Sequence, residues 1–230
     1  MFPERIEFVQ RKFGSLFYQD NEAIFFNPET PSDCFSLSLD KVVAYQTLFP
    51  VVDQLERAGI KCVQSISQQK FNLAIISIPN SKKLARHLIY LATKAAPEGL
   101  IIVDGEKSNG IESIIRDLKK QTKISNIISK SHGKIAWFET PAELEMYKDI
   151  ALNIEDGFKT QAGVFSADGI DPASKLLAQL LPGNLTGVGA DLGGGWGYLS
   201  VKALEKDSIS ELHFIAVSYT HLTLPTNREV

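Results

Sequence analysis

Hydrophobic and polar positions alternate along the first two-thirds of this chain in a way that predicts strands followed by helices. Continuous apolar runs of strand length occupy residues 73–78 and 100–103. Between them, apolar side chains at 84, 85, 88, 89, 91 and 92 form one helical stripe, which Ser81 or Asn80 can cap. A strand, a helix and a strand in that order predict a βαβ unit with two parallel strands.

The segments around this unit continue the same alternation. Residues 23–26 form a short β run that ends at the turn signals Asn27-Pro28 and Thr30-Pro31-Ser32. Further along we expect a helix over 51–58, a strand over 61–65, a turn at Asp104-Gly105, a helix with apolar positions 111, 114, 115 and 118, and a last strand over 134–138. The fold class is therefore α/β.

A second region follows an acidic, turn-rich connector with a short helix at residues 139–157. Asp171 as N-cap and Pro172 at the first helical position predict a helix start, and Leu176, Leu177, Leu180 and Leu181 are expected to be its buried stripe. A strand leading to Asp191, a helix over 198–206 and a strand over 211–217 come next.

Glycines at every second position follow that strand, in the order Asp191-x-Gly193-x-Gly195-x-Gly197. Glycine is favoured where a turn uses positive φ, and where the backbone must approach a ligand. The spacing differs from the Gly-x-Gly-x-x-Gly dinucleotide fingerprint and resembles the turn of class I S-adenosylmethionine-dependent methyltransferases. The alternative is a glycine-rich hairpin, although a hairpin needs only one or two glycines.

Composition is that of an ordinary globular protein, with 44% hydrophobic and 22% charged residues and a net charge of −3. The apolar runs are too short to span a bilayer, which needs about 20 residues. Charged residues near the N-terminus lie where a secretory signal would need its apolar core, so no such signal is expected. We therefore expect a cytoplasmic protein with no membrane contact. Cys34 and Cys62 are expected to be reduced thiols, and neither they nor the histidines have the spacing of metal ligands.

Positive charge is concentrated in one stretch, residues 107–134. Residues 1–150 hold 19 Lys and Arg against 18 Asp and Glu, whereas residues 151–230 hold 5 against 9. A local excess of this kind can contact the phosphates of RNA, and its alternative is a solvated helix face followed by a basic loop. The candidate RNA-binding residues are Lys119, Lys120, Lys123, Lys130 and Lys134.

The glycine turn, the segment 163–166 and the helix start at 168–171 together resemble bacterial 16S ribosomal RNA guanine-N2 methyltransferases. Segments 75–82 and 103–113 resemble the N-terminal part of the same family. The resemblance implies two tandem Rossmann-like methyltransferase domains: a degenerate one at 1–148 and the start of an S-adenosylmethionine-binding domain at 149–217. It also implies methylation of the exocyclic N2 of a guanine in small-subunit ribosomal RNA by a monomer.

Site residues follow from the resemblance. Gly193, Gly195 and Gly197 would let the backbone approach the methionine part of the cofactor. Asp191 would engage the cofactor's amino group, a charge-assisted contact worth about 1.5–3 kcal/mol. Phe165 and Ser166 lie in the segment that packs over the cofactor in that family, and simple core packing is the alternative for Phe165. The resemblance assigns no metal.

The chain departs from this family in ways that predict an inactive, C-terminally truncated fragment. Ser218 stands where an acidic residue would bind the cofactor ribose, and no Asn-Pro-Pro-aromatic motif is present to hold a guanine, so no catalytic residue is assigned. Only 39 residues follow Asp191, and residues 218–230 are interpreted as a non-native tail. The alternatives are a non-catalytic RNA-binding or folding module, and a methyltransferase with a different RNA or a small-molecule substrate.

Overall fold

The computed structural model describes residues 2–14, 22–37, 41–66, 68–141, 144–149, 152–154, 157–160, 162–206 and 208–217. The chain divides into two compact units, Met1–Asp149 and Ile150–Val230, here called unit 1 and unit 2. Residues 218–230 lie outside the described part, so their interpretation as a non-native tail stays a prediction. Within the described residues, no helix is long and apolar enough to cross a membrane.

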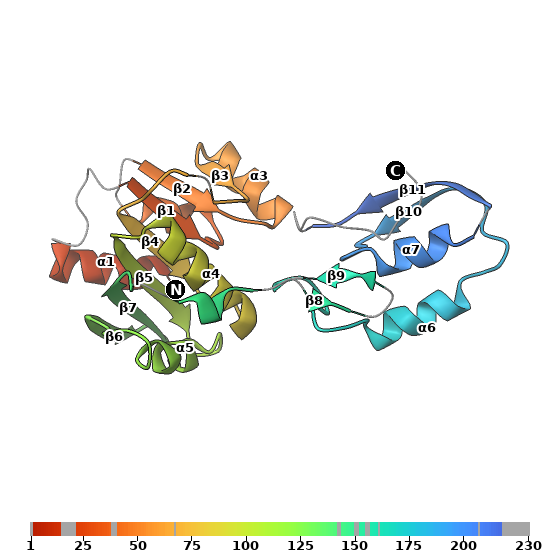
Figure 1. Ribbon diagram of the computed structural model, residues 1–230. Helices are drawn as coiled ribbons and strands as arrows, with labels where there is room; N and C mark the ends of the chain where they lie inside the picture. Colours follow the sequence, from red (N-terminus) through yellow and green to blue (C-terminus); the bar gives the residue numbers. More distant parts are fainter. Residues whose placement is uncertain are drawn as a thin grey trace. The chain divides into compact units, whose positions relative to one another are not determined.

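Unit 1 is built on a seven-stranded sheet (Figure 1). From one edge to the other its strands are β3 (Lys61–Val63), β2 (Lys41–Tyr45), β1 (Glu22–Phe26), β4 (Leu73–Ser77), β5 (Leu100–Glu106), β7 (Gly133–Glu139) and β6 (Asn126–Lys130). The pairs from β3 to β5 are parallel, and β7 is antiparallel to both of its neighbours. The strand order reverses between β1 and β4, as it does in doubly wound α/β folds, which bind ligands at this point.

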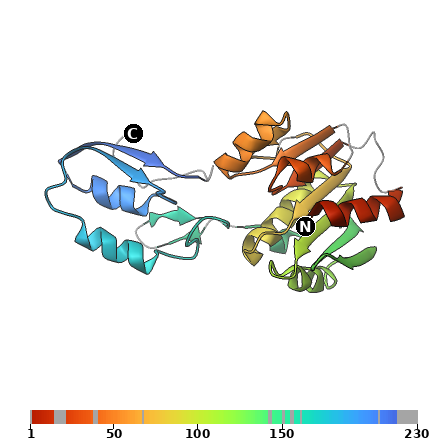
Figure 2. The same ribbon diagram turned by 180° about the vertical axis from the view of Figure 1, so that it is seen from behind.

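Helices cover both faces of this sheet. Figure 1 looks onto α4 (Lys82–Ala95) and α5 (Ile111–Leu118), whereas Figure 2 looks onto the opposite face, with α1 (Phe2–Lys12) in front. The short α2 (Pro31–Phe35) and α3 (Phe49–Arg57) contribute Cys34 and Leu55 to the core on the α1 side. Burial on two sides explains why the central strands are continuous apolar runs.

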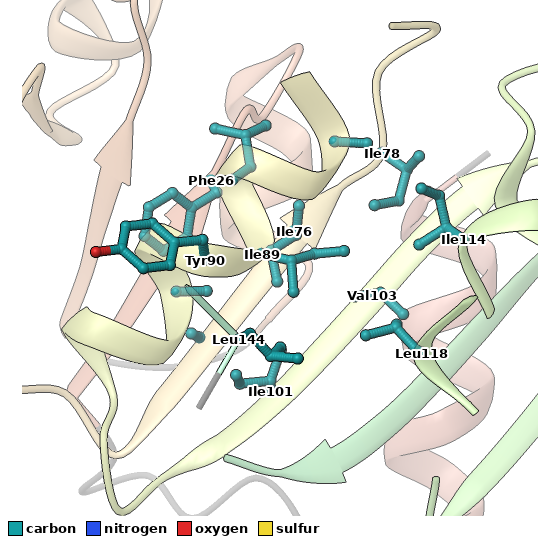
Figure 3. Close-up of a cluster of buried hydrophobic side chains, with 14 of the residues drawn as sticks. Phe26, Ile76, Ile78, Ile89, Tyr90, Ile101, Val103, Ile114, Leu118 and Leu144 are labelled. Carbon is teal, nitrogen blue, oxygen red and sulfur yellow. The ribbon is translucent and has the colours of Figure 1, made fainter. Parts of the chain in front are cut away.

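The larger of the two cores lies between the sheet and the helices α4 and α5 (Figure 3). Ile76, Ile101 and Val103 project from the strands and Ile89 from α4, all with no exposed surface. Burying such a side chain contributes about 1.5–3 kcal/mol. Leu144, from the segment after β7, packs into the same core, so this segment is part of unit 1.

A buried ion pair joins the N-terminal helix to the carboxyl end of β5. Arg5 and Asp104 are each 1% exposed, and the guanidinium donates two hydrogen bonds to the carboxylate, at 2.6 and 2.8 Å. Burial lowers the pKa of Arg5, but the hydrogen bonds to Asp104 and the charge of Asp104 outweigh this effect. The pKa of Arg5 therefore lies above its ordinary value. The predicted turn at Asp104-Gly105 is wrong, because both residues lie within β5 and continue its pairing with β7.

Most other predicted elements of unit 1 are confirmed with shifted ends. Ser81 caps α4, because its hydroxyl accepts a hydrogen bond from the backbone N–H of Leu84 at 3.3 Å. The helix expected over 51–58 begins at Phe49, and the strand expected over 61–65 ends at Val63. Four elements of unit 1, namely α1, α2, β2 and β6, are not among those predicted from the sequence, although Phe2, Ile6 and Val9 of α1 have helical spacing.

Unit 2 is smaller. Its elements are a two-stranded antiparallel pair, β8 (Leu152–Asn153) with β9 (Lys159–Thr160), followed by α6 (Pro172–Leu180), β10 (Gly187–Leu192), α7 (Tyr198–Leu204) and β11 (Ile209–Ile215). β10 and β11 are parallel neighbours. Phe158, Trp196 and Tyr198 form a small aromatic core. Trp196 and Tyr198 are each 7% exposed, and both rings pack against Phe158.

The expected buried stripe of α6 is wrong. Leu176, Leu177 and Leu180 are 57%, 49% and 67% exposed, and no residue of α6 is buried. The leucine spacing is that of an amphipathic helix, but burial needs an opposing surface. Among the described residues, β10 pairs with β11 alone, and α6 contacts mainly α7, so unit 2 offers that stripe little to pack against.

The two cysteines differ in accessibility, and this predicts their reactivity. Burial raises the pKa of Cys34 to about 12 and that of Cys62 to about 11. Only the thiolate is a nucleophile, so both should react with iodoacetamide more slowly at pH 8 than a free cysteine, with its pKa of about 8.5. We expect Cys62, which is only half-buried, to react first, and both rates to rise up to pH 10 when followed by mass spectrometry. Faster labelling of Cys34, or a plateau near pH 9, would contradict this.

Candidate cofactor-binding site

The glycine-rich segment of unit 2 is a tight turn between β10 and α7. Gly193, Gly195 and Gly197 have φ values of +80°, +59° and +94°. An L-residue in such a left-handed conformation costs about 1–2 kcal/mol, so glycine is the residue that fits. The backbone N–H groups of Gly193 and Gly194 both donate to the carbonyl oxygen of Ile215 on β11, at 2.9 and 3.0 Å. The predicted sequence of strand, turn and helix is confirmed.

The glycines of the turn serve two different purposes. A Cβ atom at Gly193 or Gly195 would meet nothing within 4 Å, so these positions leave open space beside the backbone. A Cβ atom at Gly194 would instead lie 2.3 Å from the Phe214 ring. Gly194 is thus required by packing against β11. The pattern of alternate glycines does not identify Gly194, because its contact with Phe214 depends on the β10–β11 register.

A cavity of about 90 Å³ lies beside this turn. Phe165 and Ser166 line it together with the turn, so the structure brings together the residues that the family resemblance had grouped. Phe165 is 68% exposed and is not a core residue. Ser166 has a φ of +52° and donates a hydrogen bond to the carbonyl oxygen of Gly169 at 2.8 Å. This bond holds the backbone of the segment next to the turn.

The N-terminus of α6 forms another wall of the same cavity. Asp171 accepts hydrogen bonds from the backbone N–H and the hydroxyl of Ser174, at 2.8 and 3.1 Å, and both residues line the cavity. The predicted N-cap at Asp171 is therefore confirmed. Its carboxylate accepts a hydrogen bond from one of the backbone N–H groups that the first turn of a helix leaves unpaired.

Asp191 does not line the cavity beside the turn. Its Oδ2 accepts a hydrogen bond from the hydroxyl of Ser200 on α7, at 2.6 Å. It lines a second, larger cavity of about 320 Å³, whose walls are mostly apolar residues of α6, α7, β10 and β11. The turn cavity is lined instead by Gly193, Gly194 and Gly195. A direct contact between Asp191 and the amino group of a cofactor stays a prediction.

The corresponding turn of unit 1, after β1, is built without glycine. Asn27 takes a φ of +60°, and its side-chain amide donates to the carbonyl oxygen of Ser77 at 3.0 Å. Asp33 of α2 accepts hydrogen bonds from the backbone N–H groups of Glu29 and Thr30, at 3.0 and 2.9 Å. These backbone donors are therefore already satisfied within the protein. A cavity of about 270 Å³ at this edge of the sheet is lined in part by the Arg5–Asp104 pair.

The five lysines singled out in the sequence fall in three separate places. Lys119, Lys120 and Lys123 are exposed and lie between the end of α5 and the start of β6. Lys130 lies at the other end of β6, with its ammonium 4.9 Å from the centre of the Phe8 ring on α1. Lys134 pairs with Glu112 of α5 at 2.9 Å. Because α5 and α1 cover opposite faces of the sheet, Lys134 and Lys130 contact helices on different faces. The five do not form one continuous basic surface.

The doubly wound sheet of unit 1 and the glycine turn of unit 2 define a Rossmann-like α/β protein with the class I methyltransferase fold. Residues 155–228 match the family model described as "Methyltransferase small domain". The fold of the chain resembles a solved structure, the T. thermophilus 16S rRNA N2 G1207 methyltransferase in complex with AdoMet and guanosine. Its TM-score is 0.69 and its identity 17%, over 94% of this chain and 62% of that one.

Curated relatives carry names of the same kind. The chain is 29% identical to ribosomal RNA small subunit methyltransferase C of Shewanella loihica, over 78% of this chain and 58% of that protein. It is 23% identical to ribosomal RNA large subunit methyltransferase G of Yersinia pestis, over 77% of this chain and 48% of that protein. The chain thus spans about half the length of the curated relatives it matches. The resemblance to ribosomal RNA methyltransferases is confirmed.

Proposed function

We propose that the protein carrying this chain is an S-adenosylmethionine (AdoMet)-dependent methyltransferase that acts on ribosomal RNA, with its cofactor at the turn between β10 and α7. The observation that carries the proposal is the cavity in which a side-chain-free backbone at Gly193 and Gly195 faces Phe165 and Ser166. The two sequence relatives and the solved structure support the proposal, because each is named as a ribosomal RNA methyltransferase.

The residues present fit such a cofactor. Gly193 and Gly195 have positive φ angles and open space at the Cβ position, so a ligand can approach the main chain there. The exposed ring of Phe165 offers an apolar surface at the rim of the cavity. When bound, AdoMet supplies an activated methyl group to a nucleophile. The residues of this chain bind the cofactor and fix its orientation, which is a large part of the work of such an enzyme.

The finer proposal is that the acceptor is the exocyclic N2 of a guanine in small-subunit ribosomal RNA. The name of the T. thermophilus neighbour, an N2 methyltransferase of 16S rRNA, supports this choice. The large-subunit relative makes large-subunit ribosomal RNA the second candidate substrate. We also propose that residues 1–230 alone give no turnover, because their sequence has neither an acidic residue directly after Val217 nor an Asn-Pro-Pro-aromatic motif.

The test combines cofactor binding with methyl transfer. We expect the protein carrying this chain to bind AdoMet in calorimetry, and to transfer a radiolabelled methyl group to 16S rRNA but not to 23S rRNA. Nuclease digestion should then recover the label as N2-methylguanosine. Residues 1–230 alone should transfer no label. Label on 23S rRNA would favour the second candidate, and absence of AdoMet binding to the larger protein would overturn the proposal.

A further inference from the structure

The hydrogen bond between Asp191 and Ser200 connects the two elements that flank the glycine turn. Asp191 is the fifth residue of β10, and Ser200 lies in the first turn of α7. The distance from Ser200 Oγ to Asp191 Oδ2 is 2.6 Å, and Ser200 is 1% exposed. A short bond from a buried hydroxyl to a carboxylate is a charge-assisted hydrogen bond, which is stronger than one between neutral groups.

The same carboxylate oxygen lies directly against the backbone of the turn. A Cβ atom at Gly194 would be 2.9 Å from Asp191 Oδ2 and 2.3 Å from the nearest atom of the Phe214 ring. On the β11 side, the carbonyl oxygen of Ile215 accepts the N–H groups of Gly193 and Gly194. The turn is therefore held by β11 through Ile215, and across its two ends by Asp191 and Ser200.

From this geometry we propose that Asp191 and Ser200 form a brace that fixes the shape of the glycine turn, and that the contribution of Asp191 to cofactor binding is positional. This inference rests on the proposed function. It assigns Ser200 a role in the site and revises the expectation that Asp191 pairs with the ammonium of the cofactor. The second cavity, which Asp191 lines, is distinct from the one that Gly193, Gly195 and Phe165 line.

The brace requires an acceptor at position 191 and a donor at position 200, but no negative charge. An asparagine at 191 keeps a side-chain oxygen that can accept the Ser200 hydroxyl, whereas an alanine does not. Asp191→Asn should therefore preserve the turn, and both Asp191→Ala and Ser200→Ala should loosen it. If Asp191 instead served as the counter-charge of a ligand, Asp191→Asn and Asp191→Ala would be equally harmful.

The first experiment measures the turn without any ligand. Amide hydrogen exchange, followed by mass spectrometry on residues 192–200 of the full chain, should accelerate by about tenfold in Ser200→Ala and Asp191→Ala. It should change by less than about threefold in Asp191→Asn. The matched control is Ser208→Ala, because the Ser208 hydroxyl bonds to the carbonyl oxygen of Leu185, away from the turn. Unchanged exchange in Ser200→Ala would overturn the brace.

The second experiment titrates AdoMet into the protein that carries this chain. We expect Asp191→Asn to bind within about threefold of the wild type, and Asp191→Ala and Ser200→Ala to bind at least about tenfold more weakly. Equal losses in Asp191→Asn and Asp191→Ala, with Ser200→Ala unaffected, would overturn the inference in favour of a direct charge contact. Absence of AdoMet binding in the wild type would count against the proposed function, while the exchange experiment would still decide the brace.

Discussion

Replacing Asp104 by alanine should lower the free energy of unfolding of unit 1 by about 3–5 kcal/mol, because the buried Arg5 guanidinium would lose the carboxylate that pairs with it most closely. Arg5 and Asp104 are each 1% exposed, and two short hydrogen bonds connect them. The partners that remain to the guanidinium, the carbonyl oxygen of Ser131 at 3.1 Å and the carboxylate of Glu106 at 3.7 Å, would not replace these two bonds. Since domains are typically stable by about 5–15 kcal/mol, we expect a large shift of the urea midpoint, measured by circular dichroism.

Two further variants make this prediction specific. Asp53 pairs with Arg57 at 3.0 Å on the surface of α3, where both side chains are well exposed, so Asp53→Ala should cost no more than about 0.5 kcal/mol. The double variant Arg5→Met with Asp104→Leu should recover most of the lost stability, because it removes both charges together. A loss below about 1 kcal/mol in Asp104→Ala would show that the pair contributes little to the fold.

The second large effect concerns the turn itself. Gly195→Val should weaken AdoMet binding by about 100-fold in the protein that carries this chain, as measured by calorimetry. The φ of +59° at Gly195 is strained for a β-branched residue, at a cost of about 1–3 kcal/mol. The new side chain would in addition occupy the open space beside the backbone, where the cavity is only about 90 Å³.

The matched control for this variant is Gly59→Val in unit 1. Gly59 also has a positive φ, of +83°, and open space around its Cβ position, but it lies in the loop between α3 and β3. It should show a similar loss of stability with unchanged AdoMet affinity. If Gly195→Val bound AdoMet as well as the wild type does, the cofactor would not lie against this turn.

The pairing of Asp104 with Arg5 is a feature that the sequence does not indicate. Asp104-Gly105 has the composition of a turn, and nothing near it in the sequence indicates that Arg5, 99 residues earlier, would pair with it. The same holds for Gly194, whose lack of a side chain is explained by Phe214 on the neighbouring strand. In both cases the decisive contact connects segments that are far apart along the chain, and local patterns contain no record of it.

The sequence by itself determined the features that depend on local conformation. The apolar runs defined β4 and β5, Ser81 and Asp171 defined helix starts, and the alternate glycines of residues 193–197 defined a turn with positive φ, because each follows from the backbone preferences of a few adjacent residues. Only the tertiary structure decided which surfaces are covered. It left the leucines of α6 exposed, separated the basic residues into three places and turned Asp191 toward Ser200, because burial and hydrogen bonding depend on which elements become neighbours.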